Sequence, residues 1–453
     1  MVLRAATTIR RVPADRDNPF ARAARAGREL LLFGGVIADQ PGQLALGLAD
    51  ALGQGDDCAA RARYRRLFTA LAEEFELGSR PSGDAWQAHL VERLLADENP
   101  FSRKCEMAGP DGPGAETVAA ARCDLAALRR LYELDAARVR TALGDDLPSW
   151  AGFRTLAEPA HAAAEVELRA RLAAEHDWAR LVPALARYYA ESGAGVLARH
   201  RAFRWVGGER PIEPVEAPDP VRLSDLIGYD LERELVERNT AHFVAGHAAN
   251  NVLIYGDRGT GKSSTVKALL NEYAGRGLRL IEVPKARLGD LTRILPLLRG
   301  RRERFILFVD DLSFDDHETH FKDLKAVLEG GIESRPANVL LYATSNRRHL
   351  VQERFSDRRG PTDEVHFGDT AQEKLSFSDR FGISVTFAQP DQERYLQIVA
   401  GLAAGRGLRV EAAELRRRAL EWAAWQNGRS GRTARQFVDF LAGELGMPPA
   451  KPG

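Results

Sequence analysis

The residue types with the most specific chemistry lie at Gly256–Ser263, where the sequence reads Gly-Asp-Arg-Gly-Thr-Gly-Lys-Ser. This run matches the pattern G-x-x-x-x-G-K-[ST], in which glycines let the backbone wrap so that its N–H groups point at phosphate oxygens. Lys262 would bring a positive charge to the β- and γ-phosphates, and the Ser263 hydroxyl would be a ligand for Mg²⁺. The run therefore predicts a binding site for ATP with Mg²⁺. We expect contacts with the nucleotide from Gly256, Asp257, Arg258, Gly259, Thr260, Gly261, Lys262, Ser263 and Ser264.

The segments on either side of this loop are those that such a site requires. Asn251–Tyr255 is a short apolar run typical of a buried parallel strand, and a helical stripe follows at Val266, Leu269, Leu270 and Tyr273. A loop between a strand and a helix places the positive end of the helix dipole at the phosphates. This context favours a phosphate site over a chance match to the pattern.

Two aspartates follow the apolar run Phe305–Val309. Asp310 and Asp311 would emerge at the C-terminal edge of the sheet, where open α/β sheets bind ligands. We expect Asp310 to hold Mg²⁺ together with Ser263, and Asp311 to activate the water that attacks the γ-phosphate. An apolar run that ends in two acids is also compatible with an ordinary strand end, but the phosphate loop upstream favours the catalytic interpretation.

Asn346 stands just after a further apolar run, Val339–Thr344. A polar amide at a strand end beside the acids can hold the attacking water near the γ-phosphate, and we assign this sensor role to Asn346. Asparagine is also common in turns, so a turn residue is the alternative. From the residue types, the catalytic group would comprise Lys262, Asp311 and Asn346.

Apolar runs of strand length indicate the fold class, an α/β core with a five-stranded parallel sheet. The expected strands are Asn251–Tyr255, Leu278–Val283, Phe305–Val309, Val339–Thr344 and Ile383–Phe387.

The first 208 residues carry apolar residues at helical spacings instead, as in Tyr64, Leu67, Leu71 and Phe75. They predict an all-α N-terminal domain whose stripes form its core, with a partner-binding surface as the alternative reading of the same pattern. The expected domains are a helical domain 1–208, a Gly- and Pro-rich linker 209–220, the nucleotide-binding core 221–390, a helical lid 391–446 and a disordered tail 447–453.

The composition limits the class of protein. The 453 residues carry 64 Lys+Arg and 64 Asp+Glu, so no global basic field attracts nucleic acid. The apolar stretch Leu30–Ala38 is too short to span a bilayer, and three cysteines in no metal-ligand spacing suit a reducing compartment. We expect a cytoplasmic protein without a membrane span.

These motifs together resemble the AAA+ superfamily, and the resemblance covers roughly residues 220–445. Most members have glutamate where this chain has Asp311, which is one methylene shorter. Ser378–Gly382 resembles the segment with the arginine finger, which implies that Arg380 reaches the γ-phosphate of a neighbouring subunit. Gly428–Arg432 resembles the start of the lid helix with the sensor 2 arginine; we assign Arg432, with Arg429 and Arg435 as the alternatives.

Leu226–Tyr229 resembles the segment that contacts adenine, which implies contacts from Ile227 and Gly228. More narrowly, the chain resembles a bacterial family of ATP-binding proteins catalogued as a domain of unknown function. The runs that carry this second resemblance are 250–264, 328–332 and 373–381.

The resemblance implies an AAA+-type ATPase that binds ATP with Mg²⁺ and hydrolyses it to ADP and phosphate. It would act as a homo-oligomer with Arg380 in trans, and remodel a protein or nucleic-acid partner that the sequence does not name. The alternative is a slowly hydrolysing nucleotide-dependent switch or scaffold that recruits partners through its helical domain. A small-molecule kinase is disfavoured because we find no acceptor site.

Overall fold

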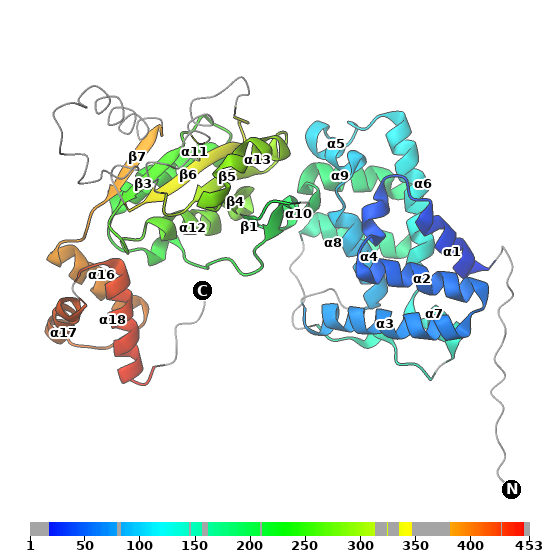
Figure 1. Ribbon diagram of the computed structural model, residues 1–453, viewed down its shortest axis with the longest axis horizontal. Helices are drawn as coiled ribbons and strands as arrows, with labels where there is room; N and C mark the ends of the chain where they lie inside the picture. The colour runs from blue at the N-terminus through cyan, green and yellow to red at the C-terminus, as the bar shows by residue number, and fades with distance from the viewer. Residues whose placement is uncertain are drawn as a thin grey trace, which may run out of the picture. The chain divides into compact units, whose positions relative to one another are not determined.

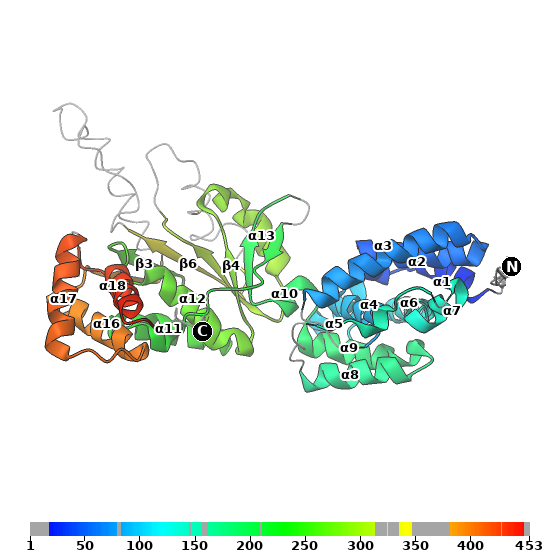
Figure 2. The ribbon, with the colours of Figure 1, turned by 90° about the horizontal axis from the view of Figure 1, so that it is seen from below.

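The computed structural model describes residues 18–78, 83–144, 146–155, 162–208, 211–312, 324, 335–346, 381–426 and 428–447. The chain divides into two compact units, Met1–Arg199 and His200–Gly453 (Figures 1 and 2). The division lies ahead of the expected boundary at residue 208. Within the described part of the chain, no helix is long and apolar enough to cross a membrane.

The first unit is built from helices, as its apolar stripes predict. Many begin at an aspartate or asparagine whose side chain accepts a backbone N–H of the first turn, as Asp39 does from Gly42 and Asp84 from Gln87. The α-helices are α1 Pro19–Arg28, α2 Gln40–Gln54, α3 Asp57–Glu76, α4 Ala85–Ala96, α5 Pro100–Ala108, α6 Ala115–Tyr132, α7 Ala136–Leu143, α8 Ala163–Ala174, α9 Val182–Ser192 and α10 Gly195–Arg199. Short 3₁₀ turns are η1 Phe33–Ile37, η2 Trp150–Gly152 and η3 Trp178–Leu181.

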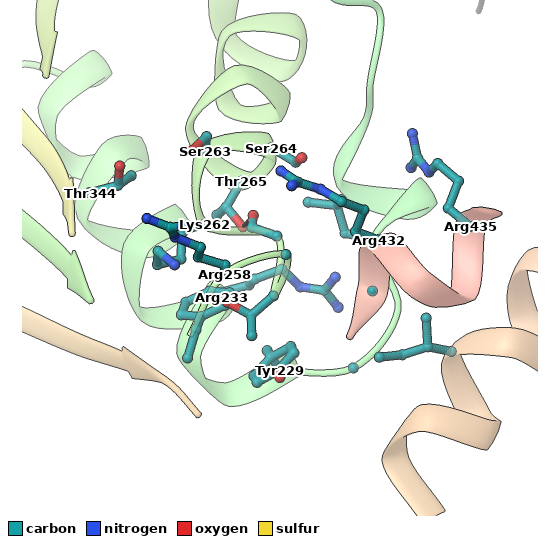
Figure 3. A pocket seen from close by; sticks show the side chains of 18 of the residues that line it. Tyr229, Arg233, Arg258, Lys262, Ser263, Ser264, Thr265, Thr344, Arg432 and Arg435 are labelled. Carbon is teal, nitrogen blue, oxygen red and sulfur yellow. Dashed lines mark hydrogen bonds between the residues drawn. The ribbon is translucent and has the colours of Figure 1, made fainter. Parts of the chain in front are cut away.

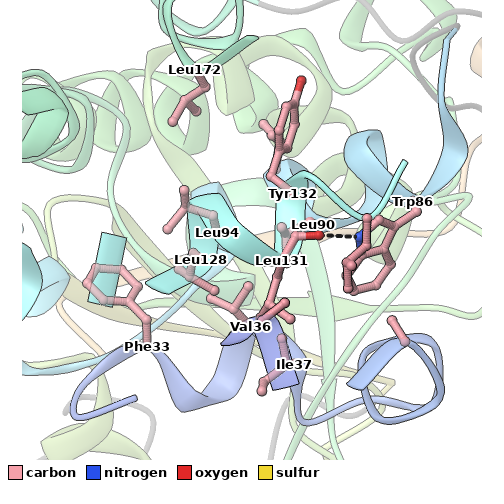
Figure 4. Close-up of a cluster of buried hydrophobic side chains, with 14 of the residues drawn as sticks. Phe33, Val36, Ile37, Trp86, Leu90, Leu94, Leu128, Leu131, Tyr132 and Leu172 are labelled. Carbon is pink, nitrogen blue, oxygen red and sulfur yellow. Dashed lines mark hydrogen bonds between the residues drawn. The ribbon is translucent and has the colours of Figure 1, made fainter. Parts of the chain in front are cut away.

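The apolar faces of these helices form one core (Figure 4). Leu90 and Leu94 of α4 and Leu128 of α6 are fully buried in it. Trp86 is also buried, and its indole N–H donates to the carbonyl of Leu131 at 2.8 Å, which satisfies its polar atom inside the core. The apolar stripes thus form the core of the helical unit, which was the first of the two interpretations, rather than a partner-binding surface.

Asp124 is a buried carboxylate that fixes the start of η1. Its side chain is 1% exposed and accepts the backbone N–H groups of Leu31, Leu32 and Phe33 at 2.7–3.0 Å. These bonds replace the water that the carboxylate loses on burial. Asp124 thereby joins α6 to the turn that follows α1.

His89 is buried between two carboxylates. Its imidazole nitrogens lie 2.7 Å from Glu74 and 3.3 Å from Asp39. Burial alone would lower the pKa of His89, but the bonds to these carboxylates outweigh it and raise the pKa above the ordinary value. Protonated His89 therefore stabilises the fold below its ordinary pKa, and this contribution is lost as the pH rises through the raised value.

We predict that His89→Gln destabilises the chain by about 1–3 kcal/mol near pH 6 and by less at alkaline pH. Below the raised pKa the substitution removes a charged partner from Asp39 and Glu74, whereas above it the wild type has lost that charge too. Denaturant unfolding followed by circular dichroism across this pH range measures the difference. His176→Gln, at an exposed histidine of the same unit, is the control. A deficit independent of pH would contradict the assignment.

The second unit contains a seven-stranded sheet in the order β2-β1-β4-β5-β6-β3-β7. All neighbouring strands are parallel except β1 and β2. The bounds are β1 Ala202–Trp205, β2 Ile212–Pro214, β3 Val252–Gly256, β4 Leu278–Glu282, β5 Arg304–Val309, β6 Val339–Ser345 and β7 Ile383–Phe387.

The expected count of five strands is wrong, because β1 and β2 extend the sheet. β1 lies within the segment expected as the end of the helical domain, and β2 within the expected linker 209–220. Pro214 is one of the prolines that suggested a linker. It lies in β2, at the edge of the sheet, and is paired with Phe203 of β1. An edge strand tolerates proline because one of its sides makes no ladder hydrogen bonds.

Two helices cover one face of the sheet. Alternate residues of the strands, such as Val252 and Ile254 of β3, pack against Val236 of α11 and Leu269 of α12. α13 lies on the other side of the sheet (Figure 2). The bounds are α11 Asp230–Val244, α12 Lys262–Tyr273 and α13 Leu291–Leu298, with 3₁₀ turns η4 Leu223–Asp225, η5 Ala274–Arg276 and η6 Lys285–Asp290.

Three helices with their own core follow β7, namely α16 Gln392–Gly405, α17 Ala412–Trp425 and α18 Gly431–Glu444. Asp391 is the N-cap of α16, at the position where the sequence predicts the lid to begin. We call α16–α18 the lid. Of the expected tail 447–453, all but Met447 lies outside the described residues.

Candidate nucleotide site

The loop after β3 is held against the end of β7. Gly256 has a φ of 141°, and a Cβ there would lie 2.0 Å from the carbonyl oxygen of Phe387. The next residue, Asp257, donates its backbone N–H to the same carbonyl at 3.2 Å. Only glycine fits this backbone conformation and spacing. The first glycine of the pattern therefore joins the phosphate loop to the sheet.

Lys262, at the first turn of α12, is buried, and its ammonium group lies inside the loop. Its Nζ donates to the carbonyls of Gly256 and Asp257, both at 2.7 Å, and to Oδ1 of Asn346 at 2.9 Å. Burial lowers the pKa of Lys262, and the nearby carboxylates of Asp257 and Asp311 partly counter this effect. A positive charge with little water around it is well suited to an anionic ligand.

Asp310 and Ser263 meet at the C-terminal edge of the sheet. The Ser263 hydroxyl donates to Oδ1 of Asp310 at 2.6 Å, and the Thr344 hydroxyl donates to the same oxygen. A hydroxyl and a carboxylate are hard oxygen ligands of the kind that Mg²⁺ prefers. The pair expected to hold the metal is thus brought together.

Asn346 lies between the lysine and the second acid. Its Oδ1 accepts from Lys262, and its Nδ2 donates to Oδ1 of Asp311 at 2.5 Å. The arrangement follows from the strand order, in which β6 separates β3 from β5. The residue after β6 can therefore reach the loop after β3 and the acids after β5.

These residues line a cavity of about 730 Å³ in the second unit (Figure 3). Its basic side chains outnumber the acidic ones by six to three, which favours an anionic ligand. The basic residues are Arg233, Arg258, Lys262, Lys267, Arg432 and Arg435, and the acidic ones Asp225, Asp310 and Asp311.

The lid contacts the phosphate loop directly. The backbone N–H of Arg432 donates to the carbonyl of Gly259 at 3.1 Å, and Ser430, two residues earlier, is the N-cap of α18. A Cβ on Gly259 would lie 3.0 Å from both Ser430 and Arg432. Of the three candidate arginines, Arg432 and Arg435 line the cavity and project from α18 in Figure 3.

Tyr229 lines the cavity together with Ile227 and Gly228, which precede it in the sequence. Its ring stacks on Phe387 at 4.9 Å, and its hydroxyl donates to the carbonyl of Ala388 at 2.5 Å. Burial raises the pKa of Tyr229 to about 12, so the hydroxyl stays protonated and can donate. Tyr229 is only 3% exposed, and Arg394 lies 4.8 Å from the centroid of its ring. The apolar wall that could contact a planar base is therefore formed by Ile227 with Ile398 and Leu402 of α16.

Most of the residues predicted from sequence line this one cavity. They are Ile227, Gly228, Arg258, Gly259, Thr260, Gly261, Lys262, Ser263, Ser264, Asp310, Asp311, Asn346 and Arg432. Gly256 and Asp257 accept hydrogen bonds from Lys262 through their carbonyls, and the backbone N–H of Asp257 donates to the end of β7. Arg380 lies outside the described residues, as do residues 328–332 and 373–380 of the runs behind the narrower resemblance.

The sequence interpretation missed several wall residues. They are Arg233, Lys267, Thr344, Ile398 and Leu402. Thr344 could have been found from the sequence, because it is a polar residue near the C-terminal end of a buried parallel strand, two residues before Asn346. Arg233 and the two apolar residues belong to helices whose position over the loop no local pattern indicates.

Comparison with known proteins gives a family match and distant structural relatives. The family described as "Protein of unknown function (DUF815)" matches residues 198–445, more than half of the chain. The RuvB Holliday junction branch migration motor of Thermotoga maritima is 17% identical, over 52% of this chain and 69% of that chain, with a TM-score of 0.35. Its R170A variant is 16% identical, over 51% and 68%, with a TM-score of 0.36. TM-scores this low support no inference about the site.

We predict that Gly256→Ala destabilises the second unit by at least about 1–2 kcal/mol and abolishes nucleotide binding, because the Cβ would displace the loop from Phe387. Thermal unfolding and titration with a fluorescent ATP analogue measure the two effects. The control is Gly275→Ala, at a glycine with no atom within 4 Å of the added Cβ. Equal behaviour of the two variants would refute the role given to Gly256.

Proposed function

Since this chain belongs to the DUF815 family of proteins of unknown function, we propose its activity from its own site: it is an AAA+-type ATPase that hydrolyses ATP to ADP and phosphate with Mg²⁺. The expectation of a family catalogued as a domain of unknown function is confirmed by the match. The observation that carries the proposed activity is the chain of hydrogen bonds Lys262–Asn346–Asp311 beside the Ser263–Asp310 pair.

Binding of the triphosphate would use the phosphate loop and the basic wall of the cavity. Lys262 exchanges its carbonyl and amide partners for phosphate oxygens, which offer more negative charge. Arg432 is carried by the lid helix that contacts Gly259, so it can close on the phosphates with the lid. The base would lie toward Ile227 and Gly228.

Ser263 and Asp310 would hold Mg²⁺, which neutralises phosphate charge when bound. Asp311 accepts a proton from the attacking water as the water oxygen forms its bond to the γ-phosphorus and the bond to the ADP oxygen breaks. Asn346, bonded to Asp311, orients that water. Lys262 then balances the charge that develops on the phosphate oxygens.

We further propose that the chain works as a homo-oligomer with Arg380 acting in trans, and that hydrolysis remodels a protein or nucleic-acid partner. An arginine suits this role because its planar, permanently charged group can neutralise charge spread over the γ-phosphate. The helical unit is the proposed site of partner recruitment. A slowly hydrolysing switch is the second candidate, because Asp311 is one methylene shorter than the glutamate of most AAA+ members.

We predict that purified protein releases phosphate from ATP at a rate per subunit that rises with protein concentration. Lys262→Ala, Asp311→Asn and Arg380→Ala should each lower the rate at least about a hundredfold, because each removes a transition-state interaction. Steady-state phosphate release and light scattering with and without ATP are the measurements.

Three results would count against parts of this proposal. Failure of the wild type to bind ATP excludes the ATPase and the switch alike. If the wild type binds ATP but turns it over no faster than Asp311→Asn does, the slowly hydrolysing switch is the remaining candidate. A rate per subunit that does not change with concentration, with Arg380→Ala fully active, excludes the trans arginine.

We predict that Arg432→Ala weakens ATP binding roughly tenfold, because it removes a charged hydrogen-bond donor from the cavity wall. Arg429→Ala, the matched control from the same segment, should bind ATP as the wild type does. Titration with a fluorescent ATP analogue compares them and includes Arg435→Ala. A larger loss in Arg429→Ala than in Arg432→Ala would reverse the assignment.

A further inference from the structure

Thr344, near the end of β6, contacts three consecutive residues at the acid pair. Its hydroxyl donates to Oδ1 of Asp310 and accepts the backbone N–H of Asp311 at 3.0 Å. Its carbonyl accepts the backbone N–H of Leu312 at 2.7 Å. The side chain is 1% exposed, so water does not compete for these bonds. One buried residue thus holds the whole turn after β5.

The backbone of Asp311 explains why this turn needs to be held. Its φ is 52°, in the left-handed region that side chains other than glycine rarely adopt. Aspartate and asparagine tolerate this region better than longer side chains do. Asp311 and Tyr229 are the described non-glycine residues with positive φ, and both line the cavity. Such backbone conformations persist only where the surroundings determine them, and here Thr344 supplies two of the bonds.

We propose that Thr344 is a positioning residue of the hydrolysis reaction, which orients Asp310 toward the metal position and maintains the left-handed turn that directs Asp311 toward Asn346. The inference rests on the proposed ATPase function and deepens it. It also accounts for aspartate at position 311, because a turn held at positive φ fits the shorter acid. Glutamate adopts positive φ less readily, and its extra methylene would move the carboxylate out of its alignment with Asn346.

The expected effect is on metal use and turnover more than on nucleotide affinity. Thr344→Val keeps the branched shape that suits a buried strand but removes both hydroxyl bonds, which leaves Asp310 and the N–H of Asp311 without them. Substitutions that disturb the support of a metal ligand typically cost ten- to a hundredfold. Thr344→Ser retains the hydroxyl and should restore both bonds.

The test compares wild type, Thr344→Val and Thr344→Ser in phosphate release as a function of Mg²⁺ concentration. We expect Thr344→Val to lower kcat and raise the Mg²⁺ concentration for half-maximal rate, each by roughly ten- to a hundredfold, with the KM for ATP changed by less than about threefold at saturating Mg²⁺. Thr344→Ser should resemble the wild type. Mg²⁺-dependent binding of a fluorescent ATP analogue is measured in parallel and does not depend on turnover.

Thr240→Val is the matched control, because Thr240 is also fully buried and its hydroxyl contacts Val236 and Tyr342 away from the cavity. It should lower the Tm without shifting the Mg²⁺ dependence. A Mg²⁺ dependence of Thr344→Val equal to that of the wild type or of Thr240→Val would overturn the proposal. If the wild type binds no nucleotide, the proposed function fails, and this inference with it. If the wild type binds nucleotide without turnover, the Mg²⁺ dependence of nucleotide binding, compared between wild type and Thr344→Val, tests the role of Thr344.

Asp311→Glu provides a second test that does not require Thr344→Val to fold. We expect it to hydrolyse ATP more slowly than the wild type, roughly tenfold or more, despite retaining a carboxylate. Nucleotide binding by Asp311→Glu should be unchanged, which separates this effect from a loss of the phosphate loop. Turnover equal to or faster than that of the wild type would show that the turn does not select aspartate.

Discussion

The bonds from Asn346 to Lys262 and to Asp311 join two parts of the site that are far apart in the sequence. They can form only because β6 lies between the strand that carries the phosphate loop and the strand that carries the acids. Parallel strands deliver their C-terminal residues to the same edge, so three strand ends meet within hydrogen-bonding distance. Ser263 reaches Asp310 for the same reason. If β6 did not lie between β3 and β5, Asn346 would be at least one further strand spacing, about 4.8 Å, from one of its two partners.

The phosphate loop is supported from two further directions. Gly256 lies against the carbonyl of Phe387 at the end of β7, and Gly259 accepts a hydrogen bond from the backbone of Arg432 in the lid. A movement of the lid is therefore transmitted to the loop without an intermediate residue. This contact gives a physical basis for coupling between a bound nucleotide and the lid, because both act on the same few backbone groups.

Buried charge is treated differently in the two units. In the helical unit Asp124 is satisfied by backbone N–H groups and His89 by two carboxylates, so burial of these charges serves the structure. In the second unit Lys262 is held by weaker partners, two carbonyls and one amide, that phosphate oxygens can replace. The difference distinguishes charges that hold a fold from a charge that is ready for a ligand.

The sequence by itself determined the glycine-rich loop at Gly256–Ser263, the position of the acid pair after its strand, and the five strands β3–β7. Each depends on local features: the backbone freedom of glycine, and apolar runs long enough for a buried strand. Only the tertiary structure decided that β1 and β2 join the sheet, that Arg432 and Arg435 face the cavity, and that Thr344 holds the turn of Asp311. In each of these the partners are distant in sequence, and their pairing depends on which surfaces pack together rather than on the residues next to them. The Gly- and Pro-rich segment shows this most clearly, since the same composition suits a linker or an edge strand until a partner strand is present.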